Sequence, residues 1–334
     1  MSVELRRDYL INRYVVFAPS RSRRPSDFKV VAATEHGSEK CPFCAGKEEQ
    51  TPPATYLLTR EGGQLRVSSD GPNERKRGWL VRVVPNLYPA FSVQEGSLTP
   101  APPGVEPTRL AYGYHEVLIE SPVHDQHFWI APEDQRQLVI RAILDRVEAF
   151  SKDNRIKSIL PFRNHGREAG ASLSHAHTQI VASEHVPAVI AAEDEAFSDG
   201  KSLVTIAEEE SKSQRAIYEN ASFYAFASWA GITPYSFVIV PKKPGPTPLG
   251  TDIPSLSDVL SKTLRALASV LNDPPFNLAW HMAPLPWDAH RSFQWHIEVY
   301  PKLSIWAGYE IGGGTYINVV TPEQAATYLR AAIK

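Results

Sequence analysis

Short apolar runs alternate with polar residues along much of the chain, and two longer segments carry apolar residues at helical spacing. The segments 115–120 and 235–240 predict strands, because successive side chains of an extended chain point to opposite faces. An amphipathic helix is predicted after each. The first begins near Pro132, with acidic residues in its first turn, and the second carries apolar residues from Leu256 to Leu271.

Further strands are predicted after both helices, at 157–162 and 174–181 in the first half and at 293–301 in the second. We therefore interpret the chain as a duplicated strand-helix-strand unit. The predicted fold class is α+β, with a largely antiparallel sheet covered by helices.

The predicted boundary between the two halves lies near residue 195, giving domains 1–195 and 196–334. A polar linker is expected at 198–213. The last helix is expected to begin at the capping box Thr321–Gln324 and to end near Ile333.

Composition narrows the class of protein. The 334 residues are 43% hydrophobic, which suffices for a packed core. No apolar run approaches the roughly 18 residues of a membrane span, and the polar start is no secretory signal, so we expect a cytoplasmic protein with no membrane partner. A formal net charge of -2 argues against nucleic acid as a partner. The local clusters Arg21–Arg24 and Arg75–Arg77 fit a small anionic ligand or a solvated surface.

Candidate chemistry concentrates at Gly170–Gln179, where His175, His177 and Gln179 alternate. On an extended strand these three side chains would line one surface. A neutral imidazole can attack phosphorus and leave again, and an amide such as Gln179 can stabilise phosphoryl oxygens. The alternative interpretation is a pair of metal ligands or of surface histidines.

Both cysteines lie in Cys41-Pro-Phe-Cys44, a spacing that allows two thiolates to bind one metal ion. A thioredoxin-type redox pair is the alternative, but that motif opens a helix after a strand, and here Gly37 and Gly46 flank it. The remaining ligands must be histidine or carboxylate, and His124 and His175 are the best candidates. Four protein ligands make a structural zinc site, which leaves His177 free to attack.

Several motifs in the same order resemble the galactose-1-phosphate uridylyltransferase family of the histidine-triad superfamily. They run from about Arg7 to Ala332 and are Arg21-Ser-Arg-Arg24-Pro25, Cys41-Pro-Phe-Cys44, Val84-Pro-Asn86-Leu-Tyr88-Pro-Ala-Phe91, Ser121-Pro-Val-His124, Asn164–Gln179 and His296-Ile-Glu298-Val-Tyr300-Pro301. The resemblance implies a duplicated histidine-triad fold and a homodimer whose active sites draw on both subunits.

The resemblance also implies the reaction. His177 would attack the α-phosphorus of a nucleotide sugar and release the sugar 1-phosphate, and a second sugar 1-phosphate would then take the nucleotide from the histidine. The implied activity is exchange of UMP between UDP-glucose and galactose 1-phosphate, a step of galactose and carbohydrate metabolism.

Each further role implied by the resemblance falls on a matching position. Gln179 would bind the transferred phosphate, and Asn164, Gly170 and Ser172 would bind phosphate oxygens. Base, ribose and phosphate would be held by Arg21, Arg24, Asn86 and Phe91, and the hexose by Tyr309 and Glu310. Cys41, Cys44, His124 and His175 match the family's zinc ligands.

Two departures favour a related activity as the alternative. The commonest motif has proline between the histidines, whereas this chain reads Leu173-Ser-His-Ala-His177, which resembles the ADP-glucose phosphorylase branch. After Glu310 the chain also lacks the glutamine that the transferases direct toward the sugar. Adenylyl transfer to phosphate would use the same nucleophile and zinc site.

Some relatives bind a second metal through one glutamate and three histidines. Glu193, His281 and His296 match that set, and Glu298 stands at the last position, where a carboxylate can also bind iron or zinc. The alternative interpretation is hydrogen bonding within a polar sheet face.

Two other functions remain as alternatives. A nucleotide hydrolase would need only water to resolve the intermediate, although the doubled length argues against it. A zinc-stabilised binding module would leave His177 without a reaction to perform.

Overall fold

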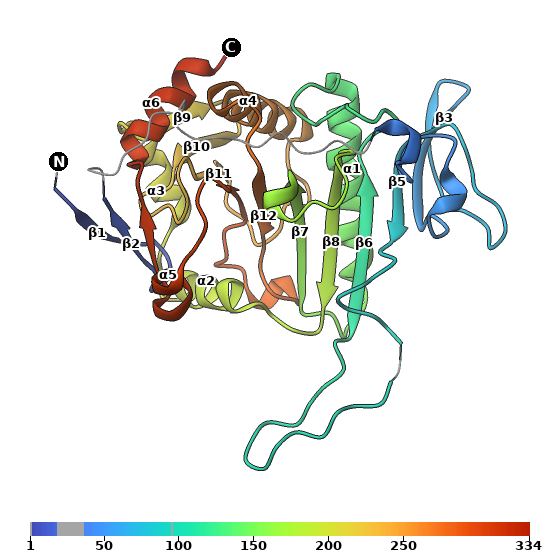
Figure 1. Ribbon diagram of the computed structural model, residues 1–334, viewed down its shortest axis with the longest axis horizontal. Coiled ribbons are helices and arrows are strands. Elements are labelled where there is room, and N and C mark those ends of the chain that lie inside the picture. The colour runs from blue at the N-terminus through green and yellow to red at the C-terminus, as the bar shows by residue number, and fades with distance from the viewer. Residues whose placement is uncertain (1, 19–36, 95) are drawn as a thin grey trace.

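The computed structural model describes residues 2–18, 37–94 and 96–334, so the predicted ligands Arg21 and Arg24 lie outside the described residues. An eleven-stranded sheet runs through both halves of the chain (Figure 1). All its strand pairs are antiparallel. In spatial order its strands are β4 (Gln64–Ser68), β3 (Tyr56–Glu61), β5 (Trp79–Pro85), β6 (Gly113–Ile119), β8 (His177–Ser183), β7 (Ser158–His165), β12 (Phe276–His281), β13 (His296–Pro301), β11 (Phe237–Pro241), β10 (Phe223–Ala227) and β9 (Ala216–Glu219).

The order of strands confirms the predicted duplication. β8 lies between β6 and β7, and β13 lies in the same way between β11 and β12. The two units meet where β7 pairs with β12, with Asn164 opposite Asn277. The chain is therefore an α+β protein built from two similar units that share one sheet. The predicted boundary at residue 195 falls within α2 (Ala188–Ser198) and stays a prediction.

Helices cover one face of this sheet along its length. α1 (Glu133–Phe150), α4 (Ile253–Leu271) and α6 (Pro322–Ala332) share one large apolar cluster with the strands beneath them. α4 begins where the Asp252 side chain accepts a hydrogen bond from the amide of Ser255, and α6 begins at the predicted capping box. This covering leaves the opposite face of β6, β8 and β7 for function.

The predicted linker at 198–213 is wrong, since α3 (Leu203–Glu210) forms there. Its buried Leu203 and Ala207 pack with α2 against the other face of β10 and β11, where Phe226 and Val240 lie. Polar residues dominate the segment. Its few apolar residues indicate a helix only when the sheet face against which they pack is known.

Smaller elements complete the fold. β1 (Glu4–Arg7), β2 (Tyr14–Phe17) and β14 (Thr315–Asn318) form a separate small sheet, and α5 (Gly308–Gly313) leads into β14. No helix within the described ranges is both long and apolar enough to cross a bilayer.

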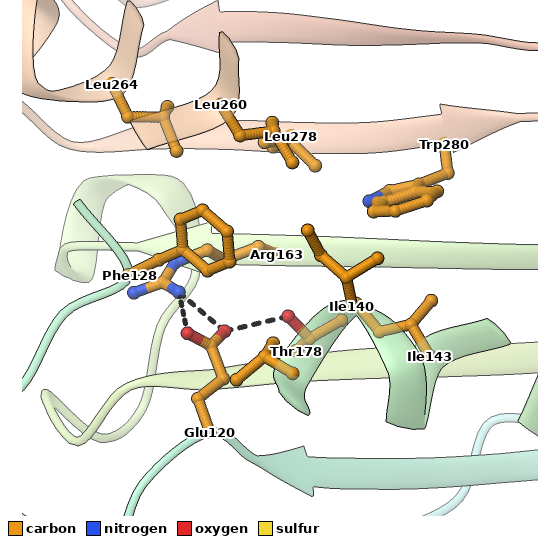
Figure 2. A pocket seen from close by; sticks show the side chains of 11 residues that line it. Glu120, Phe128, Ile140, Ile143, Arg163, Thr178, Leu260, Leu264, Leu278 and Trp280 are labelled. Atoms are coloured by element: carbon orange, nitrogen blue, oxygen red, sulfur yellow. Dashed lines mark hydrogen bonds and ion pairs between the residues drawn. The ribbon is translucent and has the colours of Figure 1, made fainter. Parts of the chain in front are cut away.

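A buried ion pair stands beside the strand that begins at His177. Arg163 Nη1 lies 2.5 Å from each carboxylate oxygen of Glu120, and Thr178 donates to the same carboxylate over 2.8 Å (Figure 2). Both charged side chains are about 95% buried. The pair joins β7 and β8 to the end of β6, on the face of the sheet covered by helices.

Replacing Arg163 by leucine is therefore expected to lower the free energy of unfolding by about 3–5 kcal/mol, because it leaves the Glu120 carboxylate buried without a counter-charge. Urea denaturation measures the loss. Lys152→Ala, which removes the exposed pair with Glu148 on the same half of the molecule, is the control and should change stability too little to measure. An equal effect of the two variants would contradict this interpretation.

Candidate active site and metal centres

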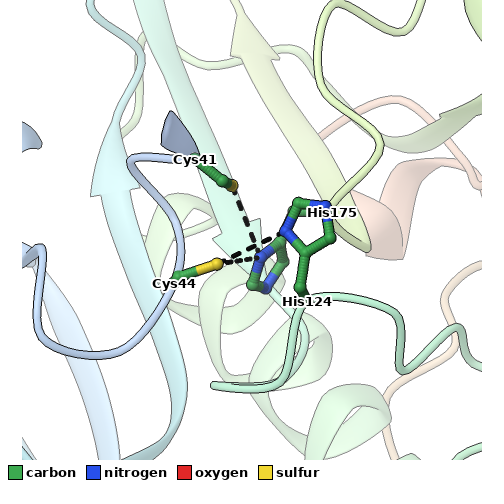
Figure 3. A group of neighbouring side chains, drawn as sticks. All are labelled: Cys41, Cys44, His124 and His175. Carbon is green, nitrogen blue, oxygen red and sulfur yellow. Dashed lines mark hydrogen bonds between the residues drawn. The ribbon is translucent and has the colours of Figure 1, made fainter. Parts of the chain in front are cut away.

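Four predicted ligands come together at one end of β8. The thiolate sulfurs of Cys41 and Cys44 and the Nδ1 atoms of His124 and His175 all lie within 4.8 Å of one another (Figure 3). The Cys44 Sγ atom lies 3.3 Å from His124 Nδ1 and 3.6 Å from His175 Nδ1. Zinc–sulfur and zinc–nitrogen bonds of about 2.3 and 2.0–2.1 Å at a tetrahedral angle require roughly 3.6 Å between these atoms. The four residues fit a tetrahedral zinc ion.

Hydrogen bonds orient both histidines for this role. His175 donates from Nε2 to the carbonyl oxygen of Ser121 over 2.8 Å, which leaves Nδ1 unprotonated. His124 Nε2 lies 3.1 Å from the hydroxyl of Ser174. Burial lowers the pKa of His175 to about 4, so the imidazole is neutral and able to bind a metal at pH 7. Among the described residues, the second group able to hold a metal is the cluster at Glu193.

The strand predicted at 174–181 starts later than expected, so His175 does not lie on it with His177 and Gln179. β8 begins only at His177, and the chain bends at His175. His175 Nδ1 faces both cysteines, 3.6 Å from each sulfur (Figure 3), while Nε2 reaches the Ser121 carbonyl oxygen. His177 and Gln179 do share a face of the strand, since they stand two residues apart within β8.

A hydrogen bond holds His177 in the tautomer whose Nε2 is unprotonated and can act as a nucleophile. Its Nδ1 lies 2.8 Å from the carbonyl oxygen of His175. Because a carbonyl only accepts, Nδ1 carries the proton, and Nε2 keeps its lone pair. Burial lowers the pKa of His177, so the ring is neutral at pH 7. The Phe43 ring, between the two cysteines, packs edge-on against the His177 imidazole at 5.5 Å.

Asn164 lies at the end of β7 beside the turn at Gly170, where φ is +89°. The amide nitrogen of Asn277 donates to Asn164 Oδ1 and to the carbonyl oxygen of Ala169, each over 2.8 Å. Since the second acceptor is a backbone carbonyl, the atom facing Asn164 is nitrogen, and the amino group of Asn164 is left to turn toward Gly170. Asn277, which the sequence did not single out, thus connects the second half to the predicted phosphate-binding loop.

The other predicted substrate-binding residues lie in different parts of the structure. Asn86 lies at Gln179, with its amide nitrogen 3.5 Å from Gln179 Oε1. Ser172 is exposed, and Phe91 is half-buried on a loop. Tyr309 is 58% exposed on α5, and Glu310 accepts a hydrogen bond from the Ala307 amide at the start of that helix. Figure 1 places α5 beside β14, across the molecule from β8.

His115 is a further site residue that sequence reasoning missed. It lies on β6, and its Nε2 is 2.8 Å from Gln179 Oε1. The signal was present in the alternation of 115–120, which places His115 and Val117 on one face. Only the register of β6 against β8, with Val117 opposite Gln179, shows which residues that face meets.

The second half carries a counterpart of the nucleophile. His296 begins β13 as His177 begins β8, although a strand from Phe293 was predicted, and His296 Nδ1 lies 2.9 Å from the carbonyl oxygen of Gln294. Its Nε2 is buried and has no hydrogen-bond partner among the described residues; it lies 3.7 Å from Glu193 Oε1 and 3.9 Å from Glu298 Oε1. His281 Nδ1 lies 2.9 Å from both oxygens of Glu193.

This cluster fits a cation. Burial alone would lower the pKa of His296, but the Glu193 carboxylate outweighs it and raises that pKa to about 9. Burial opposes ionisation of Glu193, yet the two imidazoles lower its pKa. The three ligand atoms of Glu193, His281 and His296 lie within 4.8 Å of one another, and the orphaned Nε2 of His296 is one of them. Glu298 is the adjoining fourth residue, and its other carboxylate oxygen accepts from Tyr300.

We expect Glu193→Gln to remove a second metal ion while leaving the first, because it takes away the only negative charge among the three central ligands. Elemental analysis of the purified protein should fall from two ions per chain to one. The exposed Glu195→Gln on the same helix is the matched control. A wild-type chain that holds one ion, and loses none with Glu193→Gln, would contradict the second site.

The duplicated fold, with a group of possible metal ligands beside the histidine that begins β8, is that of a family of nucleotidyltransferases, as the following relatives show. A family profile described as a domain of unknown function (DUF4921) matches residues 129–333. The chain is 34% identical to an ADP-glucose phosphorylase of Arabidopsis thaliana over 98% of its own length and 93% of the relative's. It is 26% identical to a galactose-1-phosphate uridylyltransferase of Thermotoga maritima, over 98% of each.

A crystal structure of an Arabidopsis thaliana ADP-glucose phosphorylase with bound ADP-glucose superposes with a TM-score of 0.79 at 30% identity, covering 98% of this chain and 99% of the other. The chain therefore belongs to the galactose-1-phosphate uridylyltransferase family, within the histidine-triad superfamily, and is a nucleotidyltransferase of carbohydrate metabolism.

Proposed function

We propose that this protein transfers a nucleotidyl group through a covalent nucleotidyl-histidine on His177. The observation that carries the proposal is the hydrogen bond from His177 Nδ1 to the His175 carbonyl, which leaves the lone pair of Nε2 available to attack phosphorus. Nε2 forms a bond to the α-phosphorus of a nucleotide sugar as the bond to the sugar 1-phosphate breaks. An acceptor oxygen then attacks the same phosphorus, and the histidine leaves.

Three amide and backbone groups surround this step. The amino groups of Gln179 and Asn164 stabilise phosphoryl oxygens as charge moves onto them, and Gly170 lets the backbone approach the phosphate. Asn86 contacts Gln179, and together with Phe91, Arg21 and Arg24 it binds the nucleotide. Cys41, Cys44, His124 and His175 would hold a zinc ion and so would fix the segment before His177. With four protein ligands, such an ion would leave no position for a reacting water.

We further propose ADP-glucose as the nucleotide sugar and inorganic phosphate as the acceptor. The greater identity to the ADP-glucose phosphorylase, 34% against 26%, supports this choice. Ala176 supports it too, because it stands between the two histidines, where the commonest motif of the family has proline. Uridylyl exchange between UDP-glucose and galactose 1-phosphate is the second candidate, favoured by the likeness to the Thermotoga maritima relative.

Paired initial-rate assays distinguish the two activities. The first follows glucose 1-phosphate and ADP formed from ADP-glucose and phosphate, and the second follows UDP-galactose formed from UDP-glucose and galactose 1-phosphate. We expect a kcat/KM at least about 100-fold greater for the first pair. A greater value for the second pair would assign the protein to uridylyl exchange. Hydrolysis of either nucleotide sugar at the same rate without acceptor would contradict both.

We infer that Tyr309 and Glu310 serve the hexose in the active site of a second copy of the chain. The family resemblance supports this arrangement, and so does the position of α5 across the molecule from β8 (Figure 1). Sedimentation at twice the chain mass of 37.1 kDa is the expected result, and a monomer that is fully active would contradict it.

A further inference from the structure

Gln179 can serve a phosphate only with one end of its amide. The amino group donates a hydrogen bond to a phosphoryl oxygen, whereas the carbonyl oxygen would repel it. We propose that His115 is a positioning residue, which holds the Gln179 carbonyl so that the amino group faces the transferred phosphate. This role rests on the function proposed above: His115 would decide which end of the Gln179 amide faces the phosphate.

The backbone of a neighbouring loop decides the tautomer of His115. The amide N–H of Ala90 donates to His115 Nδ1 over 3.1 Å. Nδ1 is therefore unprotonated, and the proton of the neutral ring lies on Nε2, which is 2.8 Å from Gln179 Oε1. The opposite tautomer would set two N–H groups against each other at Ala90. Burial lowers the pKa of His115, which keeps the ring neutral at pH 7.

Asn86 adds a second donor of fixed polarity. Its Oδ1 accepts from the backbone amide of Tyr88 over 2.9 Å, so its amino group faces the site. That group lies 3.5 Å from Gln179 Oε1 and 3.1 Å from His115 Nε2; because both nitrogens carry protons, neither accepts from the other, and the acceptor that they share is the Gln179 oxygen. Two N–H groups thus converge on one oxygen of Gln179. An inverted Gln179 amide would place a third donor against both of them.

The amino group of Gln179 is consequently free for a ligand. Among the described residues, none accepts a hydrogen bond from it. It lies on the face of β8 that carries His177. The Ala90 amide thus fixes the tautomer of His115, His115 fixes the orientation of the Gln179 amide, and that amide donates to the phosphate.

His115→Phe keeps the aromatic ring, which lies 6.4 Å from that of Phe162, and removes both nitrogens. We expect the single-turnover rate of nucleotidyl-histidine formation from ADP-glucose to fall about 10- to 100-fold, since removing one donor to a developing oxyanion costs roughly 100- to 1000-fold. The loss should appear in that rate, with the dissociation constant of ADP-glucose changed less than threefold. His115→Gln, which restores a donor, should recover most of the rate.

A double-mutant cycle shows whether His115 acts through Gln179. In a Gln179→Ala background, His115→Phe should cost less than threefold, because the amide it positions is gone. Losses that multiply, or an unchanged rate in His115→Phe alone, would overturn the proposal. A wild-type enzyme that forms no nucleotidyl-histidine from ADP-glucose or UDP-glucose would instead refute the proposed function.

A spectroscopic measurement tests the tautomer of His115 independently of enzyme activity. In protein labelled with ¹⁵N-histidine, the His115 resonances, assigned by their loss in His115→Phe, should show a protonated Nε2 and an unprotonated Nδ1. A protonated Nδ1 would overturn the proposal whatever the enzyme transfers.

Discussion

Replacing His177 by alanine is expected to abolish nucleotidyl transfer, with the rate falling at least about 10⁴-fold, because no other described side chain replaces its Nε2 at the start of β8. The zinc content should stay at the wild-type value. The four metal ligands are contributed by other residues, and the lost ring donates its hydrogen bond to the backbone carbonyl oxygen of His175, not to the imidazole of that residue. Initial rates with ADP-glucose and phosphate, alongside elemental analysis, measure both results.

The matched control is His185→Ala, which removes an exposed histidine just beyond the same strand. It should retain wild-type activity and zinc. If His177→Ala also lost the zinc ion, the division of roles between His175 and His177 would be wrong. If it kept a tenth or more of the activity, a different group would be the nucleophile.

Cys41→Ala is expected to remove the zinc ion and to destabilise the protein by several kcal/mol. Cys41 is buried, and a structural zinc ion contributes roughly 10–16 kcal/mol of binding free energy in small zinc domains. Activity should fall as well, because the metal anchors His175, whose carbonyl oxygen orients His177. Thermal unfolding, elemental analysis and initial rates measure the three effects.

Treating the wild type with a chelator should reproduce the loss of stability, and adding zinc back should reverse it, which Cys41→Ala cannot do. Ser174→Ala is a milder variant, since it removes only the hydroxyl beside His124 Nε2. It should keep the metal with an affinity about 10- to 100-fold weaker. A metal-free Cys41→Ala protein that unfolds at the wild-type temperature would contradict a structural role.

Local patterns in the sequence predicted the strands, the main helices and the metal ligands. The two-residue spacing between Cys41 and Cys44 is typical of a common metal or a redox pair, and the absence of further cysteines leaves histidine or carboxylate for the other ligands. Helix ends such as Thr321 are equally local, because the capping hydrogen bonds lie within four residues.

Features that depend on contacts between distant segments could not be predicted. The bend at His175 depends on the carbonyl of Ser121, and the role of His115 depends on the backbone amide of Ala90 and the register of β8. α3 was missed because its apolar residues are informative only against β10 and β11. The roles of Arg21 and Arg24, outside the described residues, stay predictions.

The central claim is that His177 carries the nucleotide, and intact-protein mass spectrometry after mixing stoichiometric enzyme with ADP-glucose tests it most directly. UDP-glucose is used in a parallel tube. The account predicts one adenylyl group per chain, placed on His177 by peptide mapping and absent from His177→Ala. A uridylyl group alone would keep the mechanism and change the substrate. Turnover without any covalent nucleotide, or an adduct on another residue, would contradict the account.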